Sequence, residues 1–149
     1  MIDESLAWAV FDGDLPTVRT MLATGADPDA VDEDGTTLVE LAVSYRHADV
    51  LRLLVESGAT LAVPSLLHNL VAGRDLPEML PILLELGADA NARDAAGWTP
   101  LHFAAADGYE GSARLLIAAG AEADAVTDTG LTPAEVARRN HRGTPGADG

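Results

Sequence analysis

Cysteine and lysine are both absent from this chain of 149 residues, and aromatic residues make up only 4% of it. Without cysteine the protein has no disulfide, no thiolate nucleophile and no zinc-thiolate site, so neither redox chemistry nor a structural zinc of that kind holds the fold together. Since aromatic side chains are so few, alanine and leucine must supply the core. All nine basic residues are arginine, a bias typical of a bacterial source with GC-rich DNA.

Long hydrophobic runs are missing as well. No apolar run in the sequence approaches the roughly 20 residues that a membrane-spanning helix needs. The opening residues Met1–Glu4 lack the basic start and the long apolar stretch of a secretion signal. We therefore expect a cytoplasmic protein that has no membrane partner.

Positive charge is scarce, and the formal net charge is −15. A nucleic-acid binder normally presents a basic face that neutralises phosphates, so this balance argues against DNA or RNA as a partner. The electrostatic field of this negative charge would speed the encounter with a protein that carries a basic patch, and salt would weaken the effect. Alternatively, the acidity only keeps an alanine-rich protein soluble.

Recognisable metal and catalytic motifs are also lacking. The densest acidic run, residues 27–34, does not fit a calcium loop, because with Gly35 as the loop glycine the first ligand position falls on Ala30 and the last on Leu41. His68 and His102 occupy the same position in successive repeats, so they are expected to lie one repeat apart and not to converge on one catalytic centre. No nucleophile elbow, zinc-binding histidine pair or phosphate-cradling glycine loop is present. The sequence thus predicts no enzyme activity, no metal and no cofactor.

Glycine, by contrast, is placed at a regular interval. Four Gly-Ala pairs begin at Gly25, Gly58, Gly87 and Gly120, spaced by 33, 29 and 33 residues, and each follows an apolar run. A period near 33 indicates a small unit that cannot bury its own apolar face and has been copied so that neighbouring units bury it for one another. The chain is therefore predicted to be a repeat array.

One repeat can be interpreted from its residues alone. Thr99 can cap a helix, and Pro100 suits the first helical position because the N–H there is unpaired in any helix. Gly108 would end this short helix, and Gly120 would end a second helix by taking the left-handed conformation. Between repeats, Asp34-Gly35 and the similar Gly97 predict tight hairpins that project from the array.

The segment W-T-P-L-H-F-A at residues 98–104 recurs in weaker form at residues 36–42 and 131–137. In this motif, and in the Gly-Ala-Asp that follows the second helix, the chain resembles the ankyrin repeat family. The resemblance covers about residues 3–140. It implies an all-α helix-turn-helix solenoid of about four full repeats and a C-terminal half repeat, whose first repeat lacks the T-P-L-H motif. The expected layout is one domain over residues 1–142, with repeats at about 3–34, 35–64, 65–96, 97–129 and 130–142, followed by a flexible tail at 143–149.

The third repeat is predicted to be irregular. Gly58 and His68 are 10 residues apart, whereas Gly87 and His102 are 15 apart, so the hairpin is expected to be missing. Pro77 could open the second helix, but Pro81 implies that this helix starts near residue 81 or is kinked. The missing hairpin would leave a notch between Tyr45 and Trp98 in which a loop of the partner could bind. Alternatively, the irregular repeat has decayed and is the most mobile part of the array.

The resemblance also implies where a partner would bind. In ankyrin domains, residues at the hairpin tips and at the ends of the first helices face a concave groove. Matched position by position, the candidates in this chain are Phe11, Asp12, Glu33, Asp34, Thr36, Ser44, Tyr45, Arg46, Ala95, Ala96, Trp98, Ala106, Asp107, Arg139 and Asn140. The strongest candidates for interface hot spots are the rings of Phe11, Tyr45 and Trp98, although Trp98 could only shield the hairpin. Trp8 is assigned to the core.

These observations favour a non-enzymatic module, expected to be monomeric, that binds a partner protein through the concave groove of hairpins and first helices. One alternative is an acidic inhibitor or immunity-type protein that covers the active site of a basic enzyme. Another is a small-molecule or catalytic site at the third repeat, for which Asp75, Glu78 and His68 are the available groups.

Overall fold

The computed structural model describes residues 3–61, 64–73 and 78–142. Within these ranges the regular structure is helical, apart from one isolated antiparallel bridge between Val31 and Thr37, which confirms the predicted all-α fold. The chain divides into two compact units, residues 1–63 and 64–149. That residues 1–142 form a single domain stays a prediction, and the expected flexible tail lies outside the described residues.

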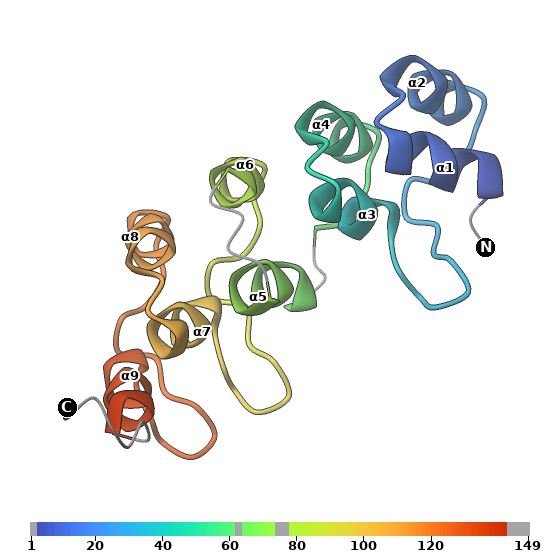
Figure 1. The fold of residues 1–149 in the computed structure, drawn as a ribbon. Helices are drawn as coiled ribbons and strands as arrows, with labels where there is room; N and C mark the ends of the chain where they lie inside the picture. Colours follow the sequence, from blue (N-terminus) through green and yellow to red (C-terminus); the bar gives the residue numbers. More distant parts are fainter. Residues whose placement is uncertain (1–2, 62–63, 74–77, 143–149) are drawn as a thin grey trace, which may run out of the picture. The chain divides into compact units, whose positions relative to one another are not determined.

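The first unit consists of two stacked helical pairs. Its helices are α1 (Glu4–Asp12), α2 (Leu15–Ala23), α3 (Leu38–Ser44) and α4 (Ala48–Glu56). Helix α1 packs against α2 and α3 against α4, while α1 also contacts α3 and α2 contacts α4. Figure 1 shows the hairpin loop between α2 and α3 extending past the first helices, on the side away from the second helices.

The second unit continues the same plan. Its helices are α5 (Pro64–Gly73), α6 (Met79–Glu85), α7 (Pro100–Asp107), α8 (Glu110–Ala118) and α9 (Pro133–Arg142). The first helices α5, α7 and α9 form one row of contacts, and α6 packs against α8. Because α9 is the last helix of the described residues, the fifth repeat shows only its first helix there, as predicted.

Helices this short are marginal alone, so burial between neighbours must stabilise them. The buried apolar side chains of the described residues are leucine, valine or alanine, except for Met79 and the prolines Pro100 and Pro133, and Leu38, Leu54, Leu80 and Leu116 are fully enclosed. No aromatic side chain is among them. The core of small aliphatic groups predicted from the composition is thus confirmed.

The first helices begin with a recurring hydrogen-bonded cap. In α3, Glu40 N–H donates to Thr37 Oγ1 at 3.1 Å, and Thr37 N–H donates to the Glu40 carboxylate at 2.9 Å. Thr132 and Glu135 repeat this pattern in α9. In α7 the partner of Thr99 is His102. Each pair satisfies backbone groups that a helix end otherwise leaves unpaired.

The predicted hairpins end in glycines with a positive φ. Gly35 has a φ of 80° and Gly97 a φ of 76°, and Gly97 N–H donates to the carbonyl of Asp94 at 3.0 Å. A β-carbon on Gly97 would collide with Asp128 of the next hairpin. Neighbouring hairpins of the second unit are therefore in contact, and Asp128 N–H donates to the carbonyl of Ala96 at 3.0 Å.

The third repeat is irregular at both predicted places. Helix α5 begins at Pro64, six residues after Gly58, whereas α7 begins 13 residues after Gly87, so the first connection has no room for a hairpin. Pro81 is the third residue of α6. The N–H groups of the first turn have no partner within the helix, so proline is tolerated there. Of the two alternatives, the helix starts near Pro81. Pro77 lies outside the described residues.

Candidate binding surface

The predicted site residues of the first unit lie at the ends of α1 and α3 and on the hairpin between α2 and α3. Phe11, Asp12, Glu33, Asp34, Ser44, Tyr45 and Arg46 are exposed, and Thr36 is partly buried. All of them except Thr36 are thus open to solvent within this unit.

Two aromatic residues of this set contact each other. The rings of Phe11, at the end of α1, and Tyr45, which follows α3, lie 4.3 Å apart between centroids at an angle of 58°. Phe11 is 37% exposed and Tyr45 46%. Two large rings that support each other and face solvent are the kind of feature that hot spots of protein interfaces favour.

The prediction that Trp8 belongs to the core is wrong. Trp8 is 61% exposed and packs edge-on against Phe11, with ring centroids 5.3 Å apart. Its counterpart in the second unit, Phe103, contacts His68 on α5, the first helix of the preceding repeat, and Trp98 on its own hairpin. In the part of the chain that the structure describes, α1 has no preceding helix or hairpin to cover it. Trp8 therefore extends the exposed aromatic cluster, which we define as Trp8, Phe11 and Tyr45.

A histidine fixes the backbone beneath this cluster. His47, the residue before α4, places Nε2 2.8 Å from the carbonyl oxygen of Phe11. Gly13 makes room for the imidazole, since a β-carbon there would lie 2.6 Å from the ring. The sequence places His47 in a turn between helices, and the structure adds its role in joining that turn to the end of α1.

Arg46 has an unusual backbone conformation. Its φ of 63° is the left-handed value at which Gly13 and Gly108 end the first helices of other repeats. A residue with a side chain is strained there by about 1–2 kcal/mol. Arg46 thus takes the place of the helix-ending glycine after α3.

The acidic run of the first unit forms turns. Asp32 Oδ1 accepts the N–H groups of Asp34 at 3.0 Å and Thr36 at 2.8 Å, which shapes the hairpin. The carboxylate of Asp29 accepts from the N–H and the hydroxyl of Thr60, one repeat further on. Among the described residues, no group of three or more histidines and carboxylates could hold a metal ion. The carboxylates of Asp29 and Asp32 thus accept hydrogen bonds that shape the backbone, while the hairpin tip at residues 33 and 34 stays exposed.

In the second unit Trp98 is partly buried. Its ring lies 5.0 Å from that of Phe103 and 5.9 Å from that of His102. This packing favours the alternative in which Trp98 shields the hairpin. Ala95 and Ala96 on the same hairpin are exposed.

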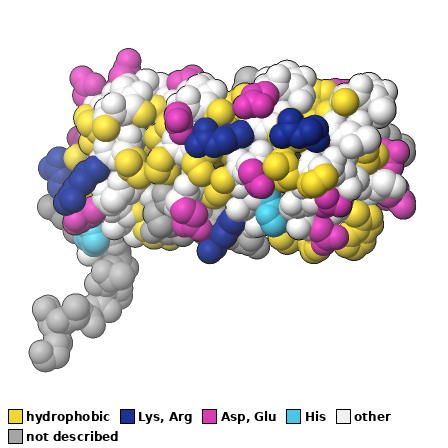
Figure 2. Space-filling model, turned by 90° about the horizontal axis from the view of Figure 1, so that it is seen from above, with side chains coloured by type: hydrophobic (Ala, Val, Ile, Leu, Met, Phe, Trp, Pro, Cys, Tyr) yellow, Lys and Arg dark blue, Asp and Glu magenta, His cyan; other side chains and the backbone are white. Residues whose placement is uncertain are grey.

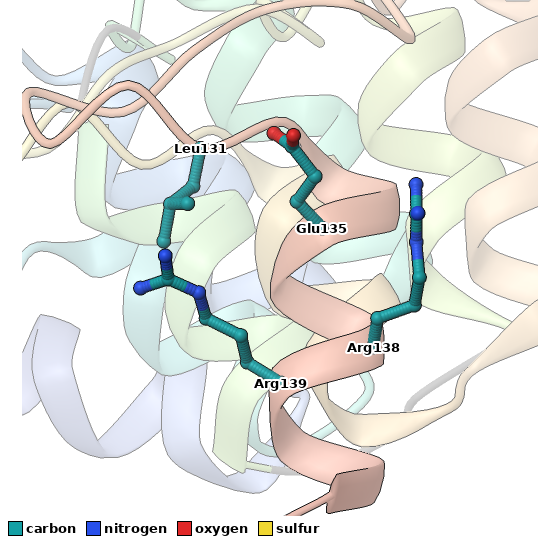
Figure 3. A pocket seen from close by; sticks show the side chains of 4 residues that line it. All are labelled: Leu131, Glu135, Arg138 and Arg139. Carbon is teal, nitrogen blue, oxygen red and sulfur yellow. The ribbon is translucent and has the colours of Figure 1, made fainter.

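The remaining candidates of the second unit lie at the ends of α7 and α9. Asp107 is exposed, and the carbonyl of Ala106 accepts from Nδ2 of Asn140 at 3.1 Å. Arg139 reaches from α9 toward Leu131, and Arg138 lies on the other side of Glu135 (Figure 3). Since the two guanidinium groups point apart, they do not converge on one anion.

The two histidines of the T-P-L-H slot bridge successive repeats. His68 places Nε2 3.1 Å from the carbonyl of Ala92, and His102 places Nε2 2.9 Å from that of Leu131. Both side chains are buried, as their predicted structural role requires. Of the groups suggested for a catalytic third repeat, Glu78 is exposed before α6, and Asp75 lies outside the described residues.

Among the residues that the structure describes, two carboxyl groups have shifted pKa values. Hydrogen bonds from the hydroxyl and the N–H of Thr17 hold the pKa of Asp14 below its ordinary value. Hydrogen bonds from the N–H and the hydroxyl of Thr132 lower the pKa of Glu135, with smaller contributions from Arg138 and Arg139. Both carboxylates cap helices, so these shifts belong to the fold and not to catalysis.

Acidic side chains are dispersed on the face that Figure 2 shows, with arginine and hydrophobic side chains between them. Every helix within the described ranges is too short or too polar to cross a bilayer.

Comparison with known proteins gives two matches to family models. One, described as ankyrin repeats (3 copies), matches residues 67–144, and the other, ankyrin repeats (many copies), matches residues 6–55.

The chain is also similar to several curated proteins. It is 47% identical over 70 residues to human protein phosphatase 1 regulatory subunit 27, covering 47% of this chain and 45% of that protein. It is 31% identical over 133 residues to the probable 26S proteasome regulatory subunit p28 of Saccharomyces cerevisiae, covering 84% and 58%. It is 31% identical over 109 residues to glycerophosphocholine phosphodiesterase gde1 of Schizosaccharomyces pombe, covering 70% and 10%. The chain thus spans less than two thirds of the length of each.

Proposed function

Because this chain belongs to the ankyrin repeat family, whose members generally act as protein-interaction modules, we propose that it is a non-enzymatic module that binds a partner protein. The binding surface consists of the ends of the first helices and the hairpin tips, and the module acts as a monomer. One fold can serve many functions, so the site of this chain must carry the assignment.

The observation that carries the proposal is the exposed aromatic cluster. Its rings contact one another in edge-on and tilted arrangements on α1 and just after α3, and one hydrogen bond from His47 fixes the backbone beneath them. A fixed surface loses little conformational freedom on binding, so more of the contact energy appears as affinity. These are the properties of a surface preformed for a partner.

The relatives support the same class of function. Two of them are regulatory subunits by name, of a phosphatase and of the proteasome. The phosphodiesterase is an enzyme by name, but the matched segment makes up only 10% of it, so the similarity gives no ground for assigning its activity to this chain.

The test compares captured partners. The full chain, the double variant Phe11→Ala/Tyr45→Ala and the control Ile117→Ala serve as baits in a lysate of the source organism. Ile117 is a matched control because it is hydrophobic and 51% exposed, but lies on a second helix. We expect the double variant alone to lose a partner, with an affinity loss above about 1 kcal/mol per ring. Equal capture by all three baits, at unchanged helicity, would rule out this surface.

The net charge of −15 favours a second candidate function, an acidic inhibitor that covers the active site of a basic enzyme. Such a protein would imitate a polyanion, and its association would depend strongly on charge.

A further inference from the structure

We propose that a hollow in the first unit binds an arginine or lysine side chain of the partner, presented next to an apolar residue. This inference rests on the proposed function and deepens it, because it states the chemistry of the segment that is recognised. The hollow has a volume of about 190 Å³ and is lined by Glu4, Ala7, Trp8, Phe11, Asp32 and Leu41. These residues come from α1, from the hairpin and from α3.

The size of the hollow selects the kind of occupant. Sites for drug-sized molecules and cofactors usually measure roughly 300–1,000 Å³. At about 190 Å³, this hollow is better matched to one side chain. A small-molecule site is therefore disfavoured, and a side chain from a protein segment fits.

The aromatic residues of the lining favour a cation that has an apolar stem. Trp8 is 61% exposed, and its ring meets Phe11 nearly at a right angle, at 73°. Tryptophan offers the best aromatic face for a guanidinium or ammonium group. Ala7 and Leu41 supply apolar surface for the methylene stem of such a side chain.

The carboxylates of the lining favour a positively charged head group. The Asp32 carboxylate is held in place by its two backbone hydrogen bonds, and Glu4 lies in the first turn of α1. The surface of the hollow is mostly apolar and suits the stem of the occupant, while the negative charges of Glu4 and Asp32 favour a cationic head group and repel an anion. The charge of the whole unit also favours a cationic occupant, since residues 1–63 contain twelve acidic residues and three arginines.

The experiment selects ligands directly and does not require the partner to be identified first. A phage-displayed library of random peptides is selected on the full chain, and the selected peptides are measured against variants by calorimetry. The variants are Trp8→Ala, the charge variant Glu4→Gln/Asp32→Asn, and the matched charge control Glu122→Gln/Asp124→Asn on exposed positions of the second unit. Circular dichroism checks that each variant is folded, and Glu4→Gln alone is used if Asp32→Asn alters the hairpin.

We expect the peptides to share an arginine or lysine beside an apolar residue. Trp8→Ala should weaken their binding about tenfold or more, because an aromatic anchor is lost. The charge variant should weaken it about three- to tenfold, and less at high salt, whereas the charge control should change it less than twofold.

The other outcomes overturn the inference in distinguishable ways. Peptides that need Phe11 and Tyr45, but carry no basic residue and ignore the charge variant, would contradict the inference and leave the proposed function standing. A Trp8-dependent change in the mass of the free chain in solution would assign the hollow to a second copy of the chain. Failure to select any peptide, with no partner captured from the lysate, would contradict both proposals.

Discussion

The ring of His102 is fully buried and uses both of its nitrogen atoms. Nδ1 accepts the N–H of Thr99 at 3.1 Å, and Nε2 donates to the carbonyl of Leu131, 29 residues further along. One side chain thus caps α7 and joins it to the following repeat. A glutamate in this slot, as in Glu40 or Glu135, can make the cap, but a carboxylate has no hydrogen to donate to the next carbonyl.

We expect His102→Ala to lower the free energy of unfolding by about 2–4 kcal/mol, because it leaves a cavity and two buried backbone groups without partners. His102→Gln should cost less, since glutamine can serve in a capping box. Urea denaturation measures both. Arg114→Ala, which removes only an exposed ion pair with Glu110, should change stability by less than about 1 kcal/mol. Equal losses for the alanine and glutamine variants would contradict the capping role.

Glu135 gives a prediction about pH. Its pKa is lowered in the folded state, so its stabilising contribution is present above the unfolded value of about 4.3 and is lost as the pH falls through the folded value. We expect the stability difference between wild type and Glu135→Gln to be constant near neutral pH and to shrink below about pH 4. Urea denaturation over a pH series measures it. A difference that grows as the pH falls would mean that the sign of the shift is wrong.

Trp8 shows what residue patterns do not predict. Its alignment with Phe103 identifies the slot correctly, but burial in that slot depends on a preceding helix and hairpin, which α1 lacks within the described residues. Tryptophan is apolar, and its position alone does not say whether a neighbour covers it. Burial in this slot therefore depends on packing between repeats and not on the residue itself.

At the scale of the elements, the positions of glycine and proline in the sequence predicted the helix boundaries well. Gly108 ends α7, Pro100 begins it, and Pro81 lies in the first turn of α6, because each of these residues restricts or frees the backbone locally. Contacts between elements could not be predicted in this way. The bond from His47 to Phe11 and the contact of Gly97 with Asp128 join residues more than 30 positions apart, so their geometry depends on packing.

Two glycines in the same turn position test the contact between hairpins. Gly97 and Gly130 have φ values of 76° and 80°, but only Gly97 faces a neighbouring hairpin. We expect Gly130→Ala to lower the free energy of unfolding by about 1 kcal/mol through backbone strain alone. Gly97→Ala should cost about 1–3 kcal/mol more, because the new methyl group collides with Asp128. Thermal or urea denaturation compares them, and equal costs would show that the hairpins are not in contact.

For the whole molecule, the net charge of −15 predicts how association depends on salt. If the protein masks a basic enzyme, the association rate constant should fall at least about tenfold between low and physiological salt, because screening removes long-range attraction. If it binds a segment with one basic side chain, the fall should be smaller, and most of the effect of mutations should appear in the dissociation rate. Stopped-flow or surface-based kinetics at several salt concentrations distinguishes the two candidates.

The hydrogen bond between His47 and the carbonyl of Phe11 has a consequence for the state of the imidazole. A carbonyl oxygen can only accept, so Nε2 of His47 must carry the hydrogen, and an imidazole donates from this nitrogen whether it is neutral or positively charged. The carbonyl of Phe11 therefore fixes which nitrogen of His47 carries the hydrogen, and an imidazole turned the other way would lose its tie to the end of α1.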